Sequence, residues 1–139
     1  VVATSIEERE LLQTQRSFIA VKTLAEQAKA TFVGIGYIAW NGPLHQDGFI
    51  NDLEVTELIE LGAVGEIAGW AYDHHGVLLQ NGTNSRVASV PLEQPAQRLI
   101  IGVAGGVKRA EAILAALRGK LITGLITDEV AAQGILAKI

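Results

Sequence analysis

The stretch GVAGGVKRAEAIL, residues 102–114, joins two elements of different periodicity through a pair of adjacent glycines. The apolar run that leads into it predicts a buried strand over residues 99–104. After the glycines, apolar residues recur at the spacing of one helix face, which predicts a helix over residues 107–117. A tight turn would explain the glycines. An anionic group bound at the end of the strand would also explain the lysine that follows them, Lys108.

The C-terminal third of the chain repeats this order of elements. A second buried strand is expected over residues 121–126, and a final helix from about Glu129, with Asp128 as its N-cap. Strands and helices that alternate with short links are typical of a parallel sheet with right-handed crossovers. The sequence therefore predicts an α/β fold built on a parallel sheet.

The glycine pair stands where such sheets bind ligands, because ligands lie beyond the carboxyl ends of the strands. Gly105 and Gly106 have no Cβ, so the backbone can approach a ligand closely, and the next helix directs free N–H groups toward the same place. Lys108 would add a positive charge, which makes phosphate the expected ligand. The alternative remains open that the glycines only make the turn and that Lys108 is solvated.

Residues 6–50 show two helical patterns, then a strand pattern and then a loop pattern. Two helices are expected first, a polar one over residues 6–15 and an amphipathic one over residues 17–30. The short apolar run TFVGIG, residues 31–36, predicts a buried strand that ends in glycines. Residues 37–50 carry turn residues and are expected to form a loop.

The middle of the chain carries shorter elements between turn signals. Asn51 is predicted to cap a helix that runs to about Leu61. Residues 65–72 have an extended pattern, and residues 77–79 are expected to pair back on them as a hairpin. Residues 86–91 are expected to add another strand.

Composition excludes several classes of function. The chain has 139 residues, of which 49% are hydrophobic and 19% charged, and this suits one domain with one core. Its net charge of −4 makes it a poor binder of DNA or RNA by itself. It contains no cysteine and no apolar run of membrane-spanning length, and from its first residues we expect no signal peptide. We expect a cytoplasmic protein with no membrane contact and no cofactor.

The first residues indicate a piece of a longer protein. The sequence contains no methionine, and it opens on Val1-Val2, which is typical of a strand cut in mid-run. We expect a trimmed domain or fragment. Removal of the initiator residue is the simpler alternative.

Four segments together resemble the effector-binding domain of SorC-family bacterial transcriptional regulators, which are sugar-binding proteins related in name to the DeoR group. The longest is residues 102–129, and residues 31–36, 62–76 and 87–93 agree in order and spacing. The resemblance covers most of the chain. It implies a three-layer Rossmann-like fold around a mostly parallel sheet, similar to the glucosamine-phosphate isomerase and ribose-phosphate isomerase fold and incomplete here.

The resemblance also implies a function. In the family, an N-terminal helix-turn-helix segment binds operator DNA, and the effector domain binds a sugar or sugar phosphate that alters the oligomer and hence the affinity for DNA. Residues 1–139 would be the C-terminal portion of that domain, without the DNA-binding segment and without the first half, which holds another glycine-rich phosphate loop. We therefore expect a homo-oligomer, and a pocket that another chain or a neighbouring subunit completes.

Individual ligand contacts are implied by the same resemblance. Lys108 is matched to the lysine of the family's GGxxKA motif, which contacts ligand phosphate, and Glu66 to an acidic position that contacts sugar hydroxyls. Gly34 and Gly36 are matched to a GIG turn that lines the cleft. Family members often have a basic residue in the following loop, where this chain offers His45, Gln46 and Asp47, so tight binding of a second phosphate is not expected. The full expected set is Glu66, Lys108, Gly105, Gly106, Gly34, Gly36, Gln46 and Asp128.

Several of these residues also have a purely structural interpretation. Glu66 is compatible with an acid at a strand edge that faces solvent. Core or interface packing explains Trp40 and Trp70 more simply than stacking on a sugar ring does. The pair His74-His75 lacks a carboxylate or cysteine at ligand spacing, so no metal site is expected.

An enzyme of the related fold, an aldose–ketose isomerase or deaminase, is the second class of function. Isomerisation needs a general base beside the carbon acid, and Glu66, Asp128 and Glu129 are candidate bases. No His, Lys or Cys stands at a recognisable spacing to partner them. The sequence therefore favours a sensor that binds a sugar phosphate without converting it.

Overall fold

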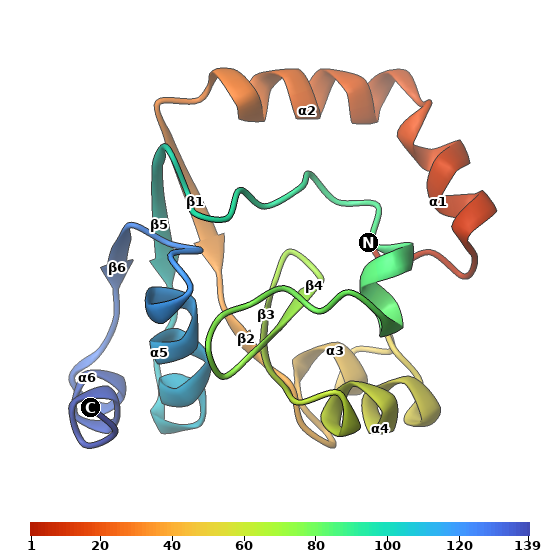
Figure 1. The fold of residues 1–139 in the computed structure, drawn as a ribbon. Helices are drawn as coiled ribbons and strands as arrows, with labels where there is room; N and C mark the ends of the chain where they lie inside the picture. The colour runs from red at the N-terminus through yellow and green to blue at the C-terminus, as the bar shows by residue number, and fades with distance from the viewer.

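The structure, a computed structural model, describes all of residues 1–139 and shows an α/β chain (Figure 1). None of its helices combines the length and the apolar character that a membrane span requires. In chain order, the elements are α1 (Ile6–Gln13), α2 (Arg16–Gln27), β1 (Ala30–Gly34), β2 (Gly36–Tyr37), α3 (Pro43–Gln46), α4 (Asp52–Glu60), β3 (Ala63–Ile67), β4 (Trp70–Asp73), the 3₁₀ helix η1 (Gly82–Arg86), β5 (Leu99–Val103), the 3₁₀ helix η2 (Val107–Arg109), α5 (Ala110–Arg118), β6 (Gly124–Ile126) and α6 (Glu129–Leu136).

The parallel sheet that the sequence predicts is present, with the strand order β1-β5-β6. β1 runs alongside β5, from Ala30 opposite Leu99 to Gly34 opposite Val103, and β5 pairs in parallel with β6. The chain passes from β5 through η2 and α5 to β6, which is the expected strand–helix–strand crossover. The prediction of an α/β fold on a parallel sheet is confirmed.

A second, antiparallel sheet has the order β2-β3-β4. Its hairpin turns at Ala68 and Gly69, which have φ angles of 54° and 91°. Two positive φ angles in a two-residue turn match the right-handed twist of the flanking strands. This hairpin fixes the register of Glu66, which lies opposite Ala71 on one side and Gly36 on the other.

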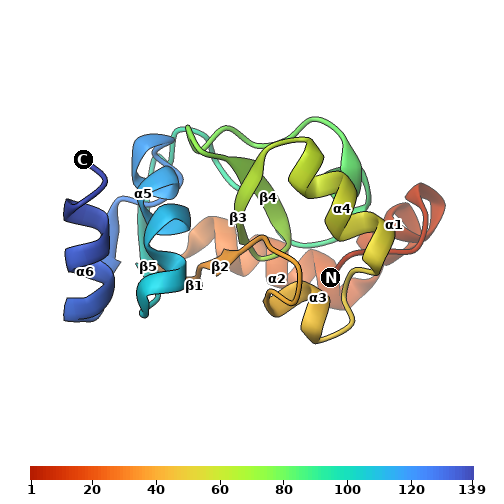
Figure 2. The same cartoon turned by 90° about the horizontal axis from the view of Figure 1, so that it is seen from below.

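Helix α5 lies at the centre of the main core. It packs between the inner face of the parallel sheet and the β3–β4 hairpin, and Figure 2 shows it beside α6. The Tyr72 hydroxyl, buried in this core, donates to the carbonyl of Ala112 at 3.0 Å. Burial is the main cause that raises the Tyr72 pKa above its usual range, and the charge of Glu66 adds to it. A smaller core forms under α4.

The outer face of the parallel sheet is uncovered. Phe32 on β1 is 64% exposed, and Leu99 on β5 and Ile126 on β6 are 48% and 53% exposed. The prediction that residues 31–36 and the two later strands are buried is therefore wrong for alternate positions. Within this chain helices cover only one face of the sheet, so the third layer of the expected sandwich is not supplied by residues 1–139.

Helices α1 and α2 form an arm along one edge of the molecule, and neither contains a buried residue (Figure 1). The Arg9 guanidinium donates to the carbonyl of Ser85, and Arg98 donates to that of Ala25. Both predicted helices are confirmed. The apolar stripe of the second helix is nevertheless exposed to solvent, and Leu24 is 67% exposed.

Some local predictions are confirmed and others are wrong. Asn51 caps α4 in a capping box with Glu54, as its spacing indicates. The segment 37–50 is not wholly a loop, because the short helix α3 lies within it. Residues 86–91 form no strand, and Val87 makes only an isolated bridge to Val2.

A candidate ligand-binding cleft

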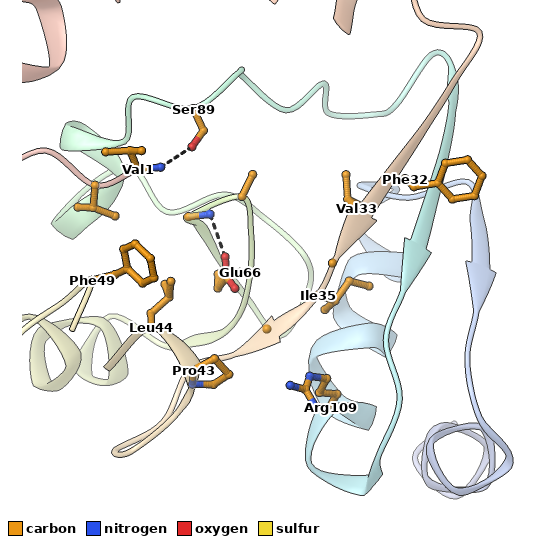
Figure 3. Close-up of a pocket in the computed structure, with 15 residues that line it drawn as sticks. Val1, Phe32, Val33, Ile35, Pro43, Leu44, Phe49, Glu66, Ser89 and Arg109 are labelled. Atoms are coloured by element: carbon orange, nitrogen blue, oxygen red, sulfur yellow. Dashed lines mark hydrogen bonds between the residues drawn. The ribbon is translucent and has the colours of Figure 1, made fainter. Parts of the chain in front are cut away.

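A cleft of about 550 Å³ lies beside the carboxyl end of β1, between that strand, α3 and the turn of the β3–β4 hairpin (Figure 3). Most of its walls are apolar. The polar side chains that line it are those of Glu66, Ser89 and Arg109. The complete lining is Val1, Val2, Phe32, Val33, Gly34, Ile35, Gly36, Pro43, Leu44, Phe49, Glu66, Ala68, Gly69, Ser89 and Arg109.

Glu66 provides a carboxylate on the hairpin side of the cleft. Its Oε2 accepts a hydrogen bond of 2.8 Å from the backbone N–H of Gly69, which fixes the carboxylate across the turn. A Cβ at Gly36 would lie 2.2 Å from Oε1 of Glu66, so the neighbouring strand leaves room for the carboxylate only because it carries glycine there. Burial raises the pKa of Glu66 above that of an exposed glutamate, although the bond from Gly69 opposes this shift.

Arg109 provides a cation on the facing side of the cleft. It ends η2, and its Nη1 donates to the carbonyl of Gly105 at 3.2 Å. Its guanidinium carbon lies 5.8 Å from the centroid of the Tyr37 ring, which supports the charged group from one side. Neither Arg109 nor Glu66 takes part in an ion pair of the chain. The cleft thus presents one guanidinium that makes no ion pair and one partly buried carboxylate from opposite walls.

Lys108 does not line this cleft. It is exposed and lines a separate groove with Trp40 and Glu111. The match of Lys108 to the family motif is one position out, because in GGVKRA the lysine position of GGxxKA falls on Arg109. The sequence analysis therefore missed the cation of the cleft, and a count along the motif would have found it.

The glycine pair Gly105-Gly106 contacts the side chain of Asp128. The N–H of Gly106, which has a φ of 87°, donates to Oδ2 of Asp128 at 2.9 Å. The other carboxylate oxygen accepts from the N–H of Ala131 at 2.7 Å and caps α6. A Cβ at Gly105 would lie 2.4 Å from the same carboxylate. The anionic group at the end of the strand is therefore the side chain of Asp128, and the Gly106 amide is already occupied.

The structure brings together only part of the expected ligand set. Glu66, Gly34 and Gly36 line one cleft, whereas Gln46 lies exposed at the end of α3 and outside it. The glycine pair and Asp128 contact each other outside the cleft. His74 and His75 stack with ring centroids 3.9 Å apart, and no group of three or more potential metal ligands occurs in the chain.

Comparison with protein families gives a match along nearly the whole chain. The profile described as "Putative sugar-binding domain" matches residues 1–137. The erythritol catabolism regulatory protein EryD of Brucella abortus is 32% identical over 98% of this chain. The transcriptional regulator LsrR of Klebsiella pneumoniae is 36% identical over 96% of it. Each match covers 43% of the relative, so the chain spans less than half the length of these curated relatives.

Solved structures have the same fold. A transcriptional regulator from Streptococcus pneumoniae TIGR4 superposes with a TM-score of 0.86 and 24% identity, over 99% of this chain and 53% of that one. The full-length sorbitol operon regulator SorC of Klebsiella pneumoniae gives a TM-score of 0.84 and 24% identity, over 97% of this chain and 44% of that one. At this identity the likeness shows the fold, and it agrees with the family match.

Proposed function

The chain belongs to the family of sugar-binding domains of SorC-type bacterial transcriptional regulators, and on this premise we propose that its cleft binds the sugar or sugar phosphate that controls such a regulator. The observation that carries the proposal is the pair of unpaired charges on opposite walls of one cleft, Arg109 and Glu66. The two groups suit the two ends of a phosphorylated sugar.

The roles of the two charges follow from their chemistry. The planar guanidinium of Arg109 donates two parallel hydrogen bonds to a phosphate, and this geometry favours arginine at anion sites. Glu66 can only accept hydrogen bonds while it is ionised, so its partners are sugar hydroxyls. Because burial destabilises the ionised form of Glu66, hydroxyl donors from a ligand would offset that cost. Apolar residues such as Leu44 and Phe49 are suited to the carbon skeleton.

The names of the relatives support a small polyol or sugar as the ligand. EryD is named for erythritol catabolism, and the SorC structure is that of a sorbitol operon regulator. For this chain we propose the same class of ligand, a small polyol or sugar, without naming a particular compound. Operator DNA is proposed to be bound by a segment outside residues 1–139, because the chain itself carries a net charge of −4. The proposed compartment is the cytoplasm, where a bacterial regulator meets DNA.

The uncovered face of the sheet supports the proposal that residues 1–139 are the C-terminal portion of a larger effector domain. All-parallel sheets are almost always covered on both faces. Here Phe32, Leu99 and Ile126 are exposed on one face. The matched structures hold about as much chain again, since this chain covers 53% of the Streptococcus pneumoniae regulator. We propose that this additional chain covers the face and completes the cleft beside β1.

We propose that the cleft binds its ligand without converting it chemically. Of the three acids considered as general bases, Glu66 lines the cleft, whereas Asp128 and Glu129 do not. No histidine or lysine lines the cleft to partner Glu66 in proton transfer. The relatives are named as regulators, which supports a sensor over an isomerase.

Thermal unfolding in the presence of a ligand panel tests the proposal. The panel contains polyols, sugars, their phosphates and inorganic phosphate. A ligand at about a hundred times its dissociation constant stabilises the folded state by about 2.7 kcal/mol, which raises the melting temperature by several degrees. We expect a shift with sugar phosphates that exceeds the shift with the parent sugars and with inorganic phosphate.

Glu66→Gln and Glu66→Ala provide the matched variants for the hydroxyl contacts. Glutamine keeps an acceptor oxygen, so we expect it to retain part of the ligand-induced shift, whereas alanine should lose most of it. The proposal would be contradicted if no ligand of the panel raised the melting temperature of residues 1–139 or of a full-length regulator that contains them. A shift with the full-length protein alone would show that the additional chain is needed to complete the cleft.

A further inference from the structure

One wall of the ligand cleft is a short segment that has little stability of its own. Pro43 and Leu44 of α3, together with Phe49, line the cleft across from Val33 of β1, and we name these three residues the α3 wall (Figure 3). Helix α3 has only four residues, and its N-cap, Gly42, has no side chain to accept from the free N–H groups. Since a single helical turn is not stable in isolation, contacts from outside the turn must hold the α3 wall in place.

His45 supplies two such contacts from the far side of α3. Its Nδ1 accepts a hydrogen bond of 3.0 Å from the N–H of Asn41, and its Nε2 lies 2.7 Å from Oδ1 of Asp52, the first residue of α4. Because a backbone N–H can only donate, the ring proton is on Nε2 and is donated to Asp52. The side chain of His45 is 10% exposed, and its ring packs against that of Trp40 with centroids 4.7 Å apart. The ring is therefore fixed at both nitrogens and from one face.

The turn that leads into α3 needs such support. Asn41 has a φ of 60°, which is a left-handed conformation that residues other than glycine rarely adopt. The N–H of Gly42 donates to the carbonyl of Ala39 at 2.8 Å, and a Cβ on Gly42 would lie 2.9 Å from the same carbonyl oxygen. The turn is thus tight on one side, and on the other side the N–H of its left-handed residue is held by His45.

His45 itself does not line the cleft, and neither of its ring nitrogens is free to bind a ligand. We propose that His45 is a positioning residue, which keeps the α3 wall in its binding position chiefly through the N–H of Asn41. The bond to Asp52 contributes less, because that carboxylate is 79% exposed and exposed charged contacts add little stability. The inference rests on the proposed function, since the wall affects binding only if the cleft takes up an effector.

Amide hydrogen exchange tests the position of the α3 wall without any ligand. The reporters are the N–H groups of Gln46 and Phe49, which donate to carbonyls within the segment. In His45→Ala we expect both to exchange about tenfold faster or more, while the amides of α5 stay as protected as in the wild type. Gln46→Ala makes the same change at the neighbouring exposed position and should leave Phe49 unaffected. Equal protection of the reporters in His45→Ala, or faster exchange in α5 as well, overturns the inference.

Two conservative variants separate the two bonds of His45. In His45→Asn the side-chain oxygen takes the place of Nδ1 and keeps the acceptor for Asn41, so exchange should stay within about threefold of the wild type. In His45→Gln the amide group takes the place of Nε2 and keeps only the contact to Asp52, so exchange should resemble that of His45→Ala. A side chain that merely filled space would be replaced better by the larger glutamine. Protection in His45→Gln but not in His45→Asn therefore overturns the assigned role.

The panel of polyols, sugars, their phosphates and inorganic phosphate is then repeated on these variants, and the compound with the largest thermal shift is titrated by calorimetry. If the α3 wall is in its binding position for only about a tenth of the time, the apparent affinity falls about tenfold, and we expect this loss in His45→Ala but not in His45→Asn. Wild-type affinity in His45→Ala overturns this inference and leaves effector binding intact. Absence of binding even by the wild type, in this chain and in the full-length regulator, overturns both proposals.

Discussion

The two faces of the β1-β5-β6 sheet differ although the same strands form both. On the inner face, Val33, Ile100 and Leu125 pack against the main core, in which Ile113 of α5 is fully buried. On the outer face, Ile126 remains 53% exposed and Phe32 64% exposed. The strand sequences are apolar on both sides, which is the pattern of a sheet covered twice. These strands are therefore suited to a partner layer that residues 1–139 do not supply.

The largest expected effect lies on the inner face. Ile113→Ala removes a fully buried side chain from a packed core, and we expect it to lower the free energy of unfolding by about 2–5 kcal/mol. Urea denaturation followed by circular dichroism measures the change. A loss below about 1 kcal/mol would show that the inner face is not packed as described.

The next largest effect concerns the turn at which the sheet meets the next helix. Asp128→Ala removes the cap of α6 and leaves the N–H of Gly106 without its acceptor, so we expect a loss of about 1–3 kcal/mol. Asp128→Asn keeps one oxygen for the N–H of Ala131 and should lose less. If the two variants were equally stable, the contact to Ala131 that asparagine retains would contribute nothing.

Ile126→Ala makes the same chemical change on the outer face and is the control for Ile113→Ala. In residues 1–139 alone it should cost about 1 kcal/mol or less, because the side chain is half exposed. In a full-length regulator, where we propose that more chain covers this face, the cost should rise to about 2–4 kcal/mol. Equal costs in the two proteins would contradict the covering of the outer face.

The smallest expected effect is a pH dependence at Glu66. Because its pKa is raised in the folded state, the folded chain binds this proton more tightly than the unfolded chain does. The ionised carboxylate therefore costs stability at neutral pH, and the cost disappears as the pH falls through the raised pKa to below the ordinary value of 4.5. Glu66→Gln keeps the acceptor for Gly69 and should melt higher than the wild type at neutral pH.

The control for this variant is Glu60→Gln, which removes the same charge from an exposed position on α4. Melting curves between acid and neutral pH give both differences. The advantage of Glu66→Gln should shrink toward zero in acid, whereas the control should show no such trend. An advantage that grows as the pH falls would contradict the assigned direction of the Glu66 pKa.

The elements set by local patterns could be predicted from the sequence. The helix periodicity after residue 107, the N-caps at Asn51 and Asp128, and the strand–helix–strand order all depend on neighbouring residues. The family resemblance likewise led to the sugar-binding domain. These predictions hold because caps and periodicity act over one or two turns.

The features that depend on distant contacts could not be predicted in the same way. Apolar strands do not reveal whether one face lacks a partner layer, so the exposure of Phe32 was missed. The occupant of the Gly106 amide is 22 positions away in the sequence. Which of Lys108 and Arg109 enters the cleft is decided by the 3₁₀ turn that precedes α5. Residue type alone does not show this, although the family motif, counted position by position, indicates Arg109.

Calorimetric titration tests whether Arg109 binds the anionic group of the ligand. The sugar phosphate with the largest thermal shift is titrated into the wild type, Arg109→Ala and Lys108→Ala, in the full-length regulator if the chain alone does not bind. We predict that Arg109→Ala weakens binding by about a hundredfold, since a charge-assisted bidentate contact is lost, and that Lys108→Ala stays within about threefold of the wild type. Equal affinities for the wild type and Arg109→Ala, or a loss confined to Lys108→Ala, would contradict the account.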